Sequence, residues 1–128
     1  MKREIKFRAW ITTDVDDEDN DIKSMTYDLA FTKYAPINEL LNKQEDLMQF
    51  TGLQDKNGVD IYEGDILTKW DGLKKKVFFS DKHFNFQLSH LDNRGFCDTL
   101  SFWNQKSTEV IGNIYENPEL LSTPTAVL

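Results

Sequence analysis

Two histidines and one cysteine are the side chains best suited to metal binding or nucleophilic chemistry. His83, His90 and Cys97 follow one another at seven-residue intervals, with Asp81 and Asp92 nearby. In a regular strand, positions an odd number apart face opposite sides of the sheet. Because this spacing separates the two histidines, the sequence predicts no shared metal ion. Cys97 follows a phenylalanine, which is more typical of a small buried hydrophobic residue than of a nucleophile.

Four lysines and a tryptophan form a second candidate site, at Lys69, Trp70, Lys74, Lys75 and Lys76. Positive charges beside aromatic rings are the ingredients of a groove for single-stranded nucleic acid on a small barrel. The favoured interpretation is a solvated hairpin whose lysines keep an edge strand from pairing with other chains. Contact with a partner protein or with nucleic acid at these residues is therefore a hypothesis, and nucleic acid is the less favoured partner.

Six acidic side chains lie within Asp14 to Asp21, with no basic residue among them, and they supply most of the formal net charge of −7. This segment lacks apolar periodicity and repels itself, so we predict a mobile acidic loop. A calcium loop of the EF-hand type does not fit, because its glycine and final glutamate are missing. Acidity localised in this way argues against phosphate binding over the whole surface.

Recognisable catalytic signatures are absent: the sequence contains no phosphate-binding loop, GxSxG, HExxH or paired-glycine cofactor motif. We therefore expect a protein that is not an enzyme and needs no cofactor. Its 128 residues, 39% hydrophobic and 29% charged, are typical of a single soluble domain. The absence of a transmembrane run and of a signal peptide predicts a cytoplasmic protein that does not bind membranes. A single cysteine allows no intrachain disulfide.

Alternating apolar residues near the start predict the first strand, from Ile5 to Ile11, with one buried face and a polar face that includes Arg8. A short strand is expected around Met25 to Tyr27. Pro36 begins a segment with helical spacing, which predicts a short helix from Pro36 to Gln44.

The stretch from Phe50 to Ile66 contains two turn signals in seventeen residues. Asn57-Gly58 predicts a type I′ hairpin turn between strands at 47–53 and 59–62, because that turn needs φ > 0 at both central residues. The glycine of Glu63-Gly64-Asp65 predicts a second sharp turn. We interpret four residues here as structural turn residues: Asn57, Gly58, Gly64 and Asp65.

Five further strands are predicted, at 66–70, 74–79, 83–89, 96–102 and 110–115. Alternation within 83–89 places Phe84, Phe86 and Leu88 on the buried face. Asn117 before a proline predicts an N-cap and one helical turn at 118–121. Short strands with tight turns predict a mainly β (β-rich α+β) fold, a small barrel or roll with an N-terminal strand and one or two short helices.

Five blocks of the sequence together resemble the YopX family of phage and prophage proteins: Arg3–Trp10 (REIKFRAW), Phe50–Leu53, Asp55–Gly58, Ile61–Ile66 and Val110–Leu121 (VIGNIYENPELL). The sequence departs from the family after Trp10, where Ile11 leads into the acidic segment and not into an aspartate followed by a lysine-methionine pair. The resemblance implies an SH3-type barrel with additions, most of its strands lying between Tyr62 and Phe102. We expect one domain over 1–121 with a barrel core at about 47–115, the acidic loop at 14–21 and a loose tail at 122–128.

The resemblance also implies assembly into a homo-oligomer, but it assigns no activity to any residue. We therefore expect a non-enzymatic accessory or regulatory protein that self-associates and binds an unknown phage or host protein. Trp10, Trp70 and Trp103 would mark an interface if they lie together on the outside of the sheet. The alternative is a nucleic-acid-binding barrel that uses the lysine and tryptophan cluster.

Overall fold

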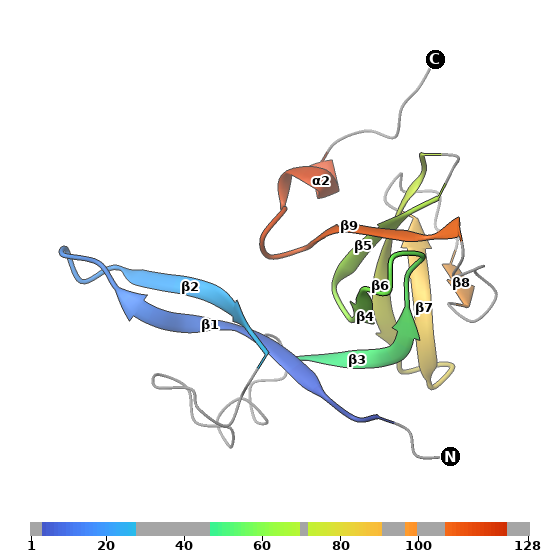
Figure 1. Ribbon diagram of the computed structural model, residues 1–128, viewed down its shortest axis with the longest axis horizontal. Coiled ribbons are helices and arrows are strands. Elements are labelled where there is room, and N and C mark those ends of the chain that lie inside the picture. The colour runs from blue at the N-terminus through green and yellow to red at the C-terminus, as the bar shows by residue number, and fades with distance from the viewer. Residues whose placement is uncertain (1–3, 28–46, 70–71, 91–96, 100–106, 123–128) are drawn as a thin grey trace. The chain divides into compact units, whose positions relative to one another are not determined.

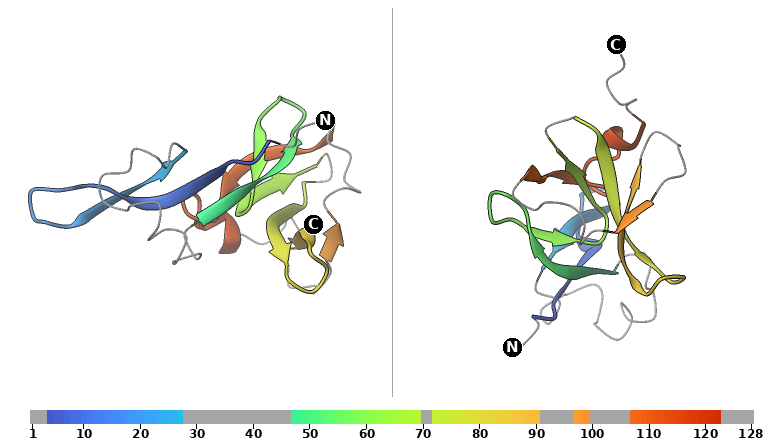
Figure 2. Two further views of the ribbon diagram at one scale, coloured as in Figure 1. Left: turned by 90° about the horizontal axis from the view of Figure 1, so that it is seen from below. Right: turned by 90° about the vertical axis from the view of Figure 1, so that its right-hand side faces the viewer.

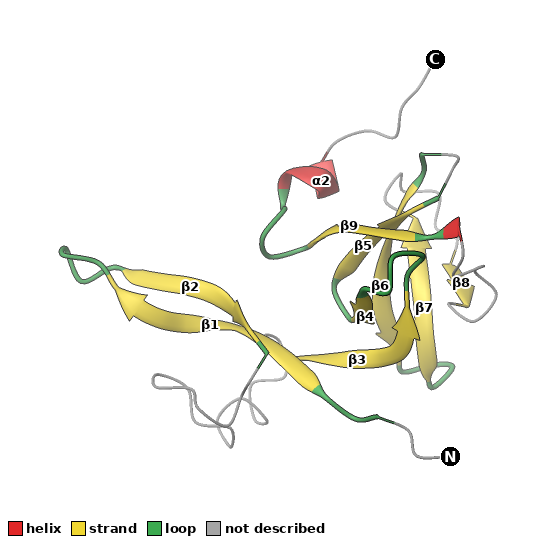
Figure 3. Cartoon of the chain, viewed as in Figure 1, coloured by secondary structure: helices red, strands yellow, loops and turns green. Residues whose placement is uncertain are grey.

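The structure is a computed structural model that describes residues 4–27, 47–69, 72–90, 97–99 and 107–122 (Figure 1). It forms two compact units, Met1–Phe50 and Thr51–Leu128, and each has its own hydrophobic core. Strands make up most of the described chain, and its α-helix is α2, Glu119–Ser122 (Figure 3). The helix predicted at 36–44, Trp70 and Trp103 lie outside the described residues.

The first unit is built on the antiparallel pair β1 (Phe7–Val15) and β2 (Asp21–Thr26). β1 also pairs with the first residues of β3 (Leu47–Gln54). The predicted period of two is confirmed in β1, where Ala9 and Ile11 are buried and Phe7 packs against them. Arg8, predicted on a solvated face, is only 3% exposed. Both faces of β1 are therefore covered at this position.

The acidic segment forms an ordered hairpin end, so the prediction of a loop over 14–21 is wrong in its extent. β1 continues to Val15 and β2 begins at Asp21. Asp16 closes the turn between them: its Oδ1 accepts hydrogen bonds from the backbone N–H groups of Glu18 (2.8 Å) and Asn20 (2.9 Å). These hydrogen bonds, with that of Asn20 contributing most, lower the pKa of Asp16 from 3.8. Local hydrogen bonding to one carboxylate thus outweighs the mutual repulsion of the acidic side chains.

The second unit contains the later part of β3 and the remaining strands, which are β4 (Asp60–Tyr62), β5 (Asp65–Thr68), β6 (Lys74–Ser80), β7 (Asn85–His90), β8 (Cys97–Thr99) and β9 (Glu109–Asn113). Five of them form a sheet in the order β8-β7-β6-β5-β9, and β4 neighbours β3 in a second sheet. All the pairings within the five-stranded sheet are antiparallel. This sheet curls into a half-barrel, which can be followed in Figure 2.

The core of the second unit lies on one face of this sheet. Its fully buried members are Ile61, Leu67, Val77 and Leu88, against which Leu53, Phe86 and Val110 pack. Each buried aliphatic side chain contributes about 1.5–3 kcal/mol to folding. The predicted fold class, a mainly β barrel or roll, is confirmed.

Candidate interaction surface on the curled sheet

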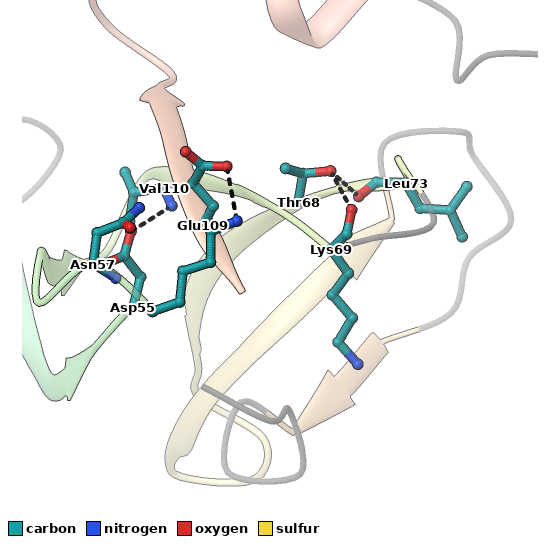
Figure 4. Close-up of polar contacts among 8 residues, drawn as sticks. Asp55, Asn57, Thr68, Lys69, Leu73, Glu109 and Val110 are labelled. Carbon is teal, nitrogen blue, oxygen red and sulfur yellow. Dashed lines mark hydrogen bonds and ion pairs between the residues drawn. The ribbon is translucent and has the colours of Figure 1, made fainter. Parts of the chain in front are cut away.

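Asp55, which precedes Asn57-Gly58, is only 6% exposed and accepts three backbone hydrogen bonds. Its Oδ1 accepts from the N–H groups of Asn57 (2.8 Å) and Val59 (2.9 Å). Its Oδ2 accepts from the N–H of Val110 in β9 at 2.9 Å (Figure 4). Both oxygens of this carboxylate therefore hold the β3–β4 turn and tie it to a strand 55 residues later in the chain.

The turn after Asp55 is not the predicted type I′ turn, although the predicted hairpin is present. Gly58 has a φ of 79°, whereas Asn57 is not among the described residues with positive φ. The Gly58 N–H donates to Asp55 O at 3.1 Å, and the Asp55 N–H donates to Val59 O at 2.9 Å. This is a three-residue loop that ends in one left-handed glycine. Capture of the Asn57 N–H by the Asp55 carboxylate favours this turn over the type I′ form.

Gly64 and Asp65 form the next corner, between β4 and β5. Gly64 has a φ of 84°; its N–H donates to Val77 O and its carbonyl accepts from the N–H of Ile114, both at 2.9 Å. Asp65 is 1% exposed, and its Oδ2 accepts from the Tyr62 N–H at 2.8 Å. These contacts join the corner to β6 and to the residue that follows β9.

The third corner follows β9. Asn113 Oδ1 accepts from the N–H groups of Tyr115 (3.0 Å) and Glu116 (2.8 Å). Asn117 was predicted as an N-cap, which is wrong for its side chain: its Oδ1 accepts from the Asn113 N–H at 3.2 Å. A Cβ added at Gly112 would come within 2.5 Å of that oxygen. Several of the sequence blocks that resemble the YopX family thus form turn and corner contacts.

The lysine cluster begins at the β5–β6 turn. The Lys69 carbonyl accepts from the Gly72 N–H at 3.0 Å, and Gly72 has a φ of 75°. Thr68 Oγ1 lies 3.3 Å from Lys69 O and 3.2 Å from Leu73 O (Figure 4). The backbone of Lys69 is therefore part of the turn, and Trp70 lies outside the described residues.

Lys74, Lys75 and Lys76 do not share one surface. They pair with Thr68, Leu67 and Ile66, respectively, so that successive side chains alternate between the faces of the sheet. Lys75 lies on the face of the buried Leu67 and is only 7% exposed. Lys74 and Lys76 lie on the opposite face and are half-buried. The cluster that looks continuous in the sequence is therefore split by the pleat of β6.

The histidines are arranged differently from the expectation. His83 is exposed and lies in the turn before β7, which begins at Asn85. His83 is therefore not part of the strand, and its predicted position on one face of that strand is wrong. The side chains of His90 and Cys97 are outside the described part of the structure. Within the part that is described, no group of three His, Cys, Asp or Glu residues is placed to hold a metal ion.

Phe84 is an exposed residue that the sequence pattern wrongly placed in the core. It was predicted in the core with Phe86 and Leu88, but it lies in the β6–β7 turn and is 80% exposed. Its φ of 54° is left-handed, and its N–H donates to Ser80 O at 2.7 Å. The three polar residues before it, Asp81 to His83, were the available signal that the turn extends as far as position 84.

Exposed apolar side chains occur in both units. In the first unit they are Ile5, Val15, Ile22 and Tyr27. In the second unit they are Val59, Phe79, Phe84 and Leu121. Trp10, expected on an outer patch, is half-buried. The exposed aromatic residues of the second unit that the structure describes, Phe79 and Phe84, lie in the β6–β7 hairpin.

Comparison with known proteins agrees with this architecture. The model of the YopX protein family matches residues 6–122. The crystal structure of protein EF1440 from Enterococcus faecalis is similar, with 29% identity and a TM-score of 0.53 over 94% of this chain and 100% of that chain. No curated protein matches the chain.

The protein is a mainly β half-barrel. The polar side chains of Asp55, Asp65 and Asn113 hold its turns and corners through hydrogen bonds to the backbone. The chain belongs to the YopX family, because the family model spans nearly all of it. No helix in the described ranges is long and apolar enough to span a membrane.

Proposed function

We propose that this YopX-family chain is a non-enzymatic, self-associating interaction module of phage or prophage type. In this proposal it acts in the cytoplasm and binds a phage or host protein. The observation that carries it is the exposure of large apolar side chains in both units. Such side chains lose unfavourable contact with water when a second protein surface covers them.

The edge strand β2 supports self-association in particular. In the described residues its hydrogen-bonded neighbour is β1, and it carries Ile22 with 44% of its surface exposed. A sheet edge offers backbone N–H and C=O groups that pair readily with a strand of another chain. A second copy of the chain would supply such a strand.

Size-exclusion chromatography with light scattering tests self-association directly. We expect a mass that is a multiple of 15.0 kDa, and a clean monomer at high micromolar concentration would contradict the proposal. Ile22→Lys should reduce the mass if β2 takes part, because it places a charge in the contact. Lys23→Ala, at the neighbouring exposed position, is the matched control and should leave the mass unchanged.

Nucleic-acid binding is the second candidate function, and one observation favours it. Lys76 and Phe78 project from the same face of β6, because they are two residues apart in one strand. The inward position of Lys75 leaves this patch smaller than the sequence predicted. Fluorescence anisotropy with single- and double-stranded oligonucleotides decides the matter, since absence of binding at about 50 mM salt would eliminate phosphate contacts.

A further inference from the structure

The β6–β7 turn holds an aromatic residue where the backbone favours glycine. Phe84 closes the turn through its N–H to Ser80 O, with a left-handed φ of 54°. The corresponding left-handed residues of two other hairpins in this unit are Gly58 and Gly72, with φ of 79° and 75°. A bulky side chain at positive φ is an outlier, and such outliers cluster at functional sites. The fold alone gives no reason for phenylalanine here.

The ring gains little from burial in its own chain. Phe84 is 80% exposed, and no other exposed hydrophobic residue of the described chain reaches that fraction. Beside the turn of the same hairpin, Phe79 is 40% exposed and packs edge-on against Phe86, with 5.3 Å between ring centroids. Phe86 in turn packs against the core. The hairpin thus has a pair of packed aromatic rings beside its turn and a third aromatic side chain exposed in the turn itself.

The residues around the ring carry both charges. Asp81 and Lys82 are exposed in the same turn, and the exposed His83 is fixed there by a hydrogen bond from its N–H to Ser80 Oγ at 3.2 Å. An aromatic centre with a polar rim is the usual composition of a protein–protein contact. Membrane insertion would require a broad apolar face and is opposed by Asp81. Single-stranded nucleic acid would require a continuous cationic groove, which the same carboxylate interrupts.

We propose that Phe84 is the anchor of a docking site, and that its ring inserts into an apolar pocket on a folded partner protein of a different sequence. Asp81 and Lys82 then face charges of opposite sign on the rim of that pocket. This inference rests on the proposed function, because it specifies which surface binds the phage or host protein. Anchors of this type provide a large share of the affinity of an interface.

A photo-crosslinking amino acid with a phenyl ring, p-benzoylphenylalanine, tests the proposal at position 84 in bacterial cells that express the full chain. The matched control carries it at Val59, an apolar residue that is 47% exposed beside the β3–β4 turn. We expect one protein to be crosslinked from position 84 and not from position 59. Crosslinking from position 84 to lipid, to nucleic acid or to a second copy, or no crosslink above the control, would overturn the proposal.

The crosslinked protein, identified and purified, then allows a binding measurement with the unlabelled chain. Phe84→Gly should lower the affinity at least ten-fold, while its melting temperature stays the same or rises. Phe84→Tyr, which keeps the ring, should bind within about three-fold of the wild type. Equal affinities of the wild type and Phe84→Gly would overturn the proposal.

Light scattering of Phe84→Gly separates this inference from self-association. We expect Phe84→Gly to keep the mass of the wild type and to lose affinity for the partner. This result would assign self-association and partner binding to different surfaces. If Phe84→Gly instead loses the mass of the assembly, the ring contacts a second copy and the docking proposal is overturned. A monomeric wild type that still binds the partner through Phe84 would remove self-association alone.

Discussion

The β3–β4 and β6–β7 turns differ in the residue that takes the left-handed backbone. In the first it is Gly58, with a φ of 79°, and in the second it is Phe84, with a φ of 54°. The first turn is held by the Asp55 carboxylate, which accepts two of the N–H groups of the turn. The second turn is held by the Ser80 hydroxyl, which accepts one. The left-handed position is thus held by glycine in the first turn and by phenylalanine in the second, so we expect the second turn to carry more backbone strain.

The β1–β2 turn is a third case and clarifies the comparison. Its left-handed residue is Asp19, with a φ of 62°, and Asp tolerates this region better than most residues. The Asp16 carboxylate organises that turn as Asp55 organises the first. Positive φ at Asp19 therefore needs no functional explanation, whereas positive φ at Phe84 does.

The largest effect is expected from Asp55→Ala. The change leaves three backbone N–H groups without their acceptor, at a site that is only 6% exposed. A hydrogen bond to a charged group contributes about 1.5–3 kcal/mol, so we expect a loss of roughly 3 kcal/mol or more. Urea unfolding followed by fluorescence measures it. Ser80→Ala, which removes a single acceptor, should cost about 1 kcal/mol; equal losses would contradict the difference between the turns.

Gly58→Ala should destabilise the chain by about 1–2 kcal/mol, because alanine is strained at a φ of 79°. A steric clash does not cause this loss of stability, since a Cβ at position 58 meets no atom within 4 Å. The same urea measurement applies, with Val59→Ala as a neighbouring control that leaves the glycine in place. A neutral effect of Gly58→Ala would show that the turn readily adopts another conformation.

Phe84→Gly should have the opposite sign and a smaller size. Relief of the left-handed strain exceeds the backbone entropy lost by glycine, so we expect a gain of about 0.5–1 kcal/mol. Thermal and urea unfolding both report this change. Phe84→Ala keeps the strain and removes the ring, so it should be close to neutral. A clear loss of stability in Phe84→Gly would mean that the ring supports the fold.

The smallest effect concerns pH at the acidic turn. Hydrogen bonds from Asn20 lower the pKa of Asp16 below 3.8 in the folded chain. The carboxylate therefore stabilises the turn above the unfolded value of 3.8, and this contribution is lost as the pH falls through the lower folded value. The Asn20 amide resonance should titrate with a midpoint below 3.8, and Asp16→Asn should abolish that titration. A midpoint at or above 3.8 would contradict the hydrogen-bonded turn.

Local patterns in the sequence predicted much of this fold. The period of two in β1 and the glycine turns before β4 and β5 led to the mainly β class, which is confirmed. The blocks around Asp55, Gly64 and Asn113 led to the YopX family, which is also confirmed. These signals succeed because a glycine or a carboxylate at a turn acts on backbone groups only a few residues away.

The same kind of pattern failed where the length of a turn decided the outcome. Alternation across 83–89 assigned Phe84 to the core, but β7 begins only at Asn85. The loop has four residues, 81–84, and two of their N–H groups donate hydrogen bonds to Ser80. β7 therefore begins two residues later than the strand predicted from position 83. The sequence likewise could not show how the lysines divide between the two faces of β6, because charge alone does not reveal that Lys75 points inward.

The amino-acid sequence by itself determined the β-rich class, the positions of most hairpins and the family, because these depend on residue types and short-range spacing. Only the tertiary structure decided that Asp55 binds Val110 in β9, that Lys75 faces the buried side of the sheet and that Phe84 faces solvent. The physical reason is that burial and long-range hydrogen bonds depend on which strands become neighbours and in which register. A one-residue shift in the register of a strand would move each of its side chains to the opposite face of the sheet.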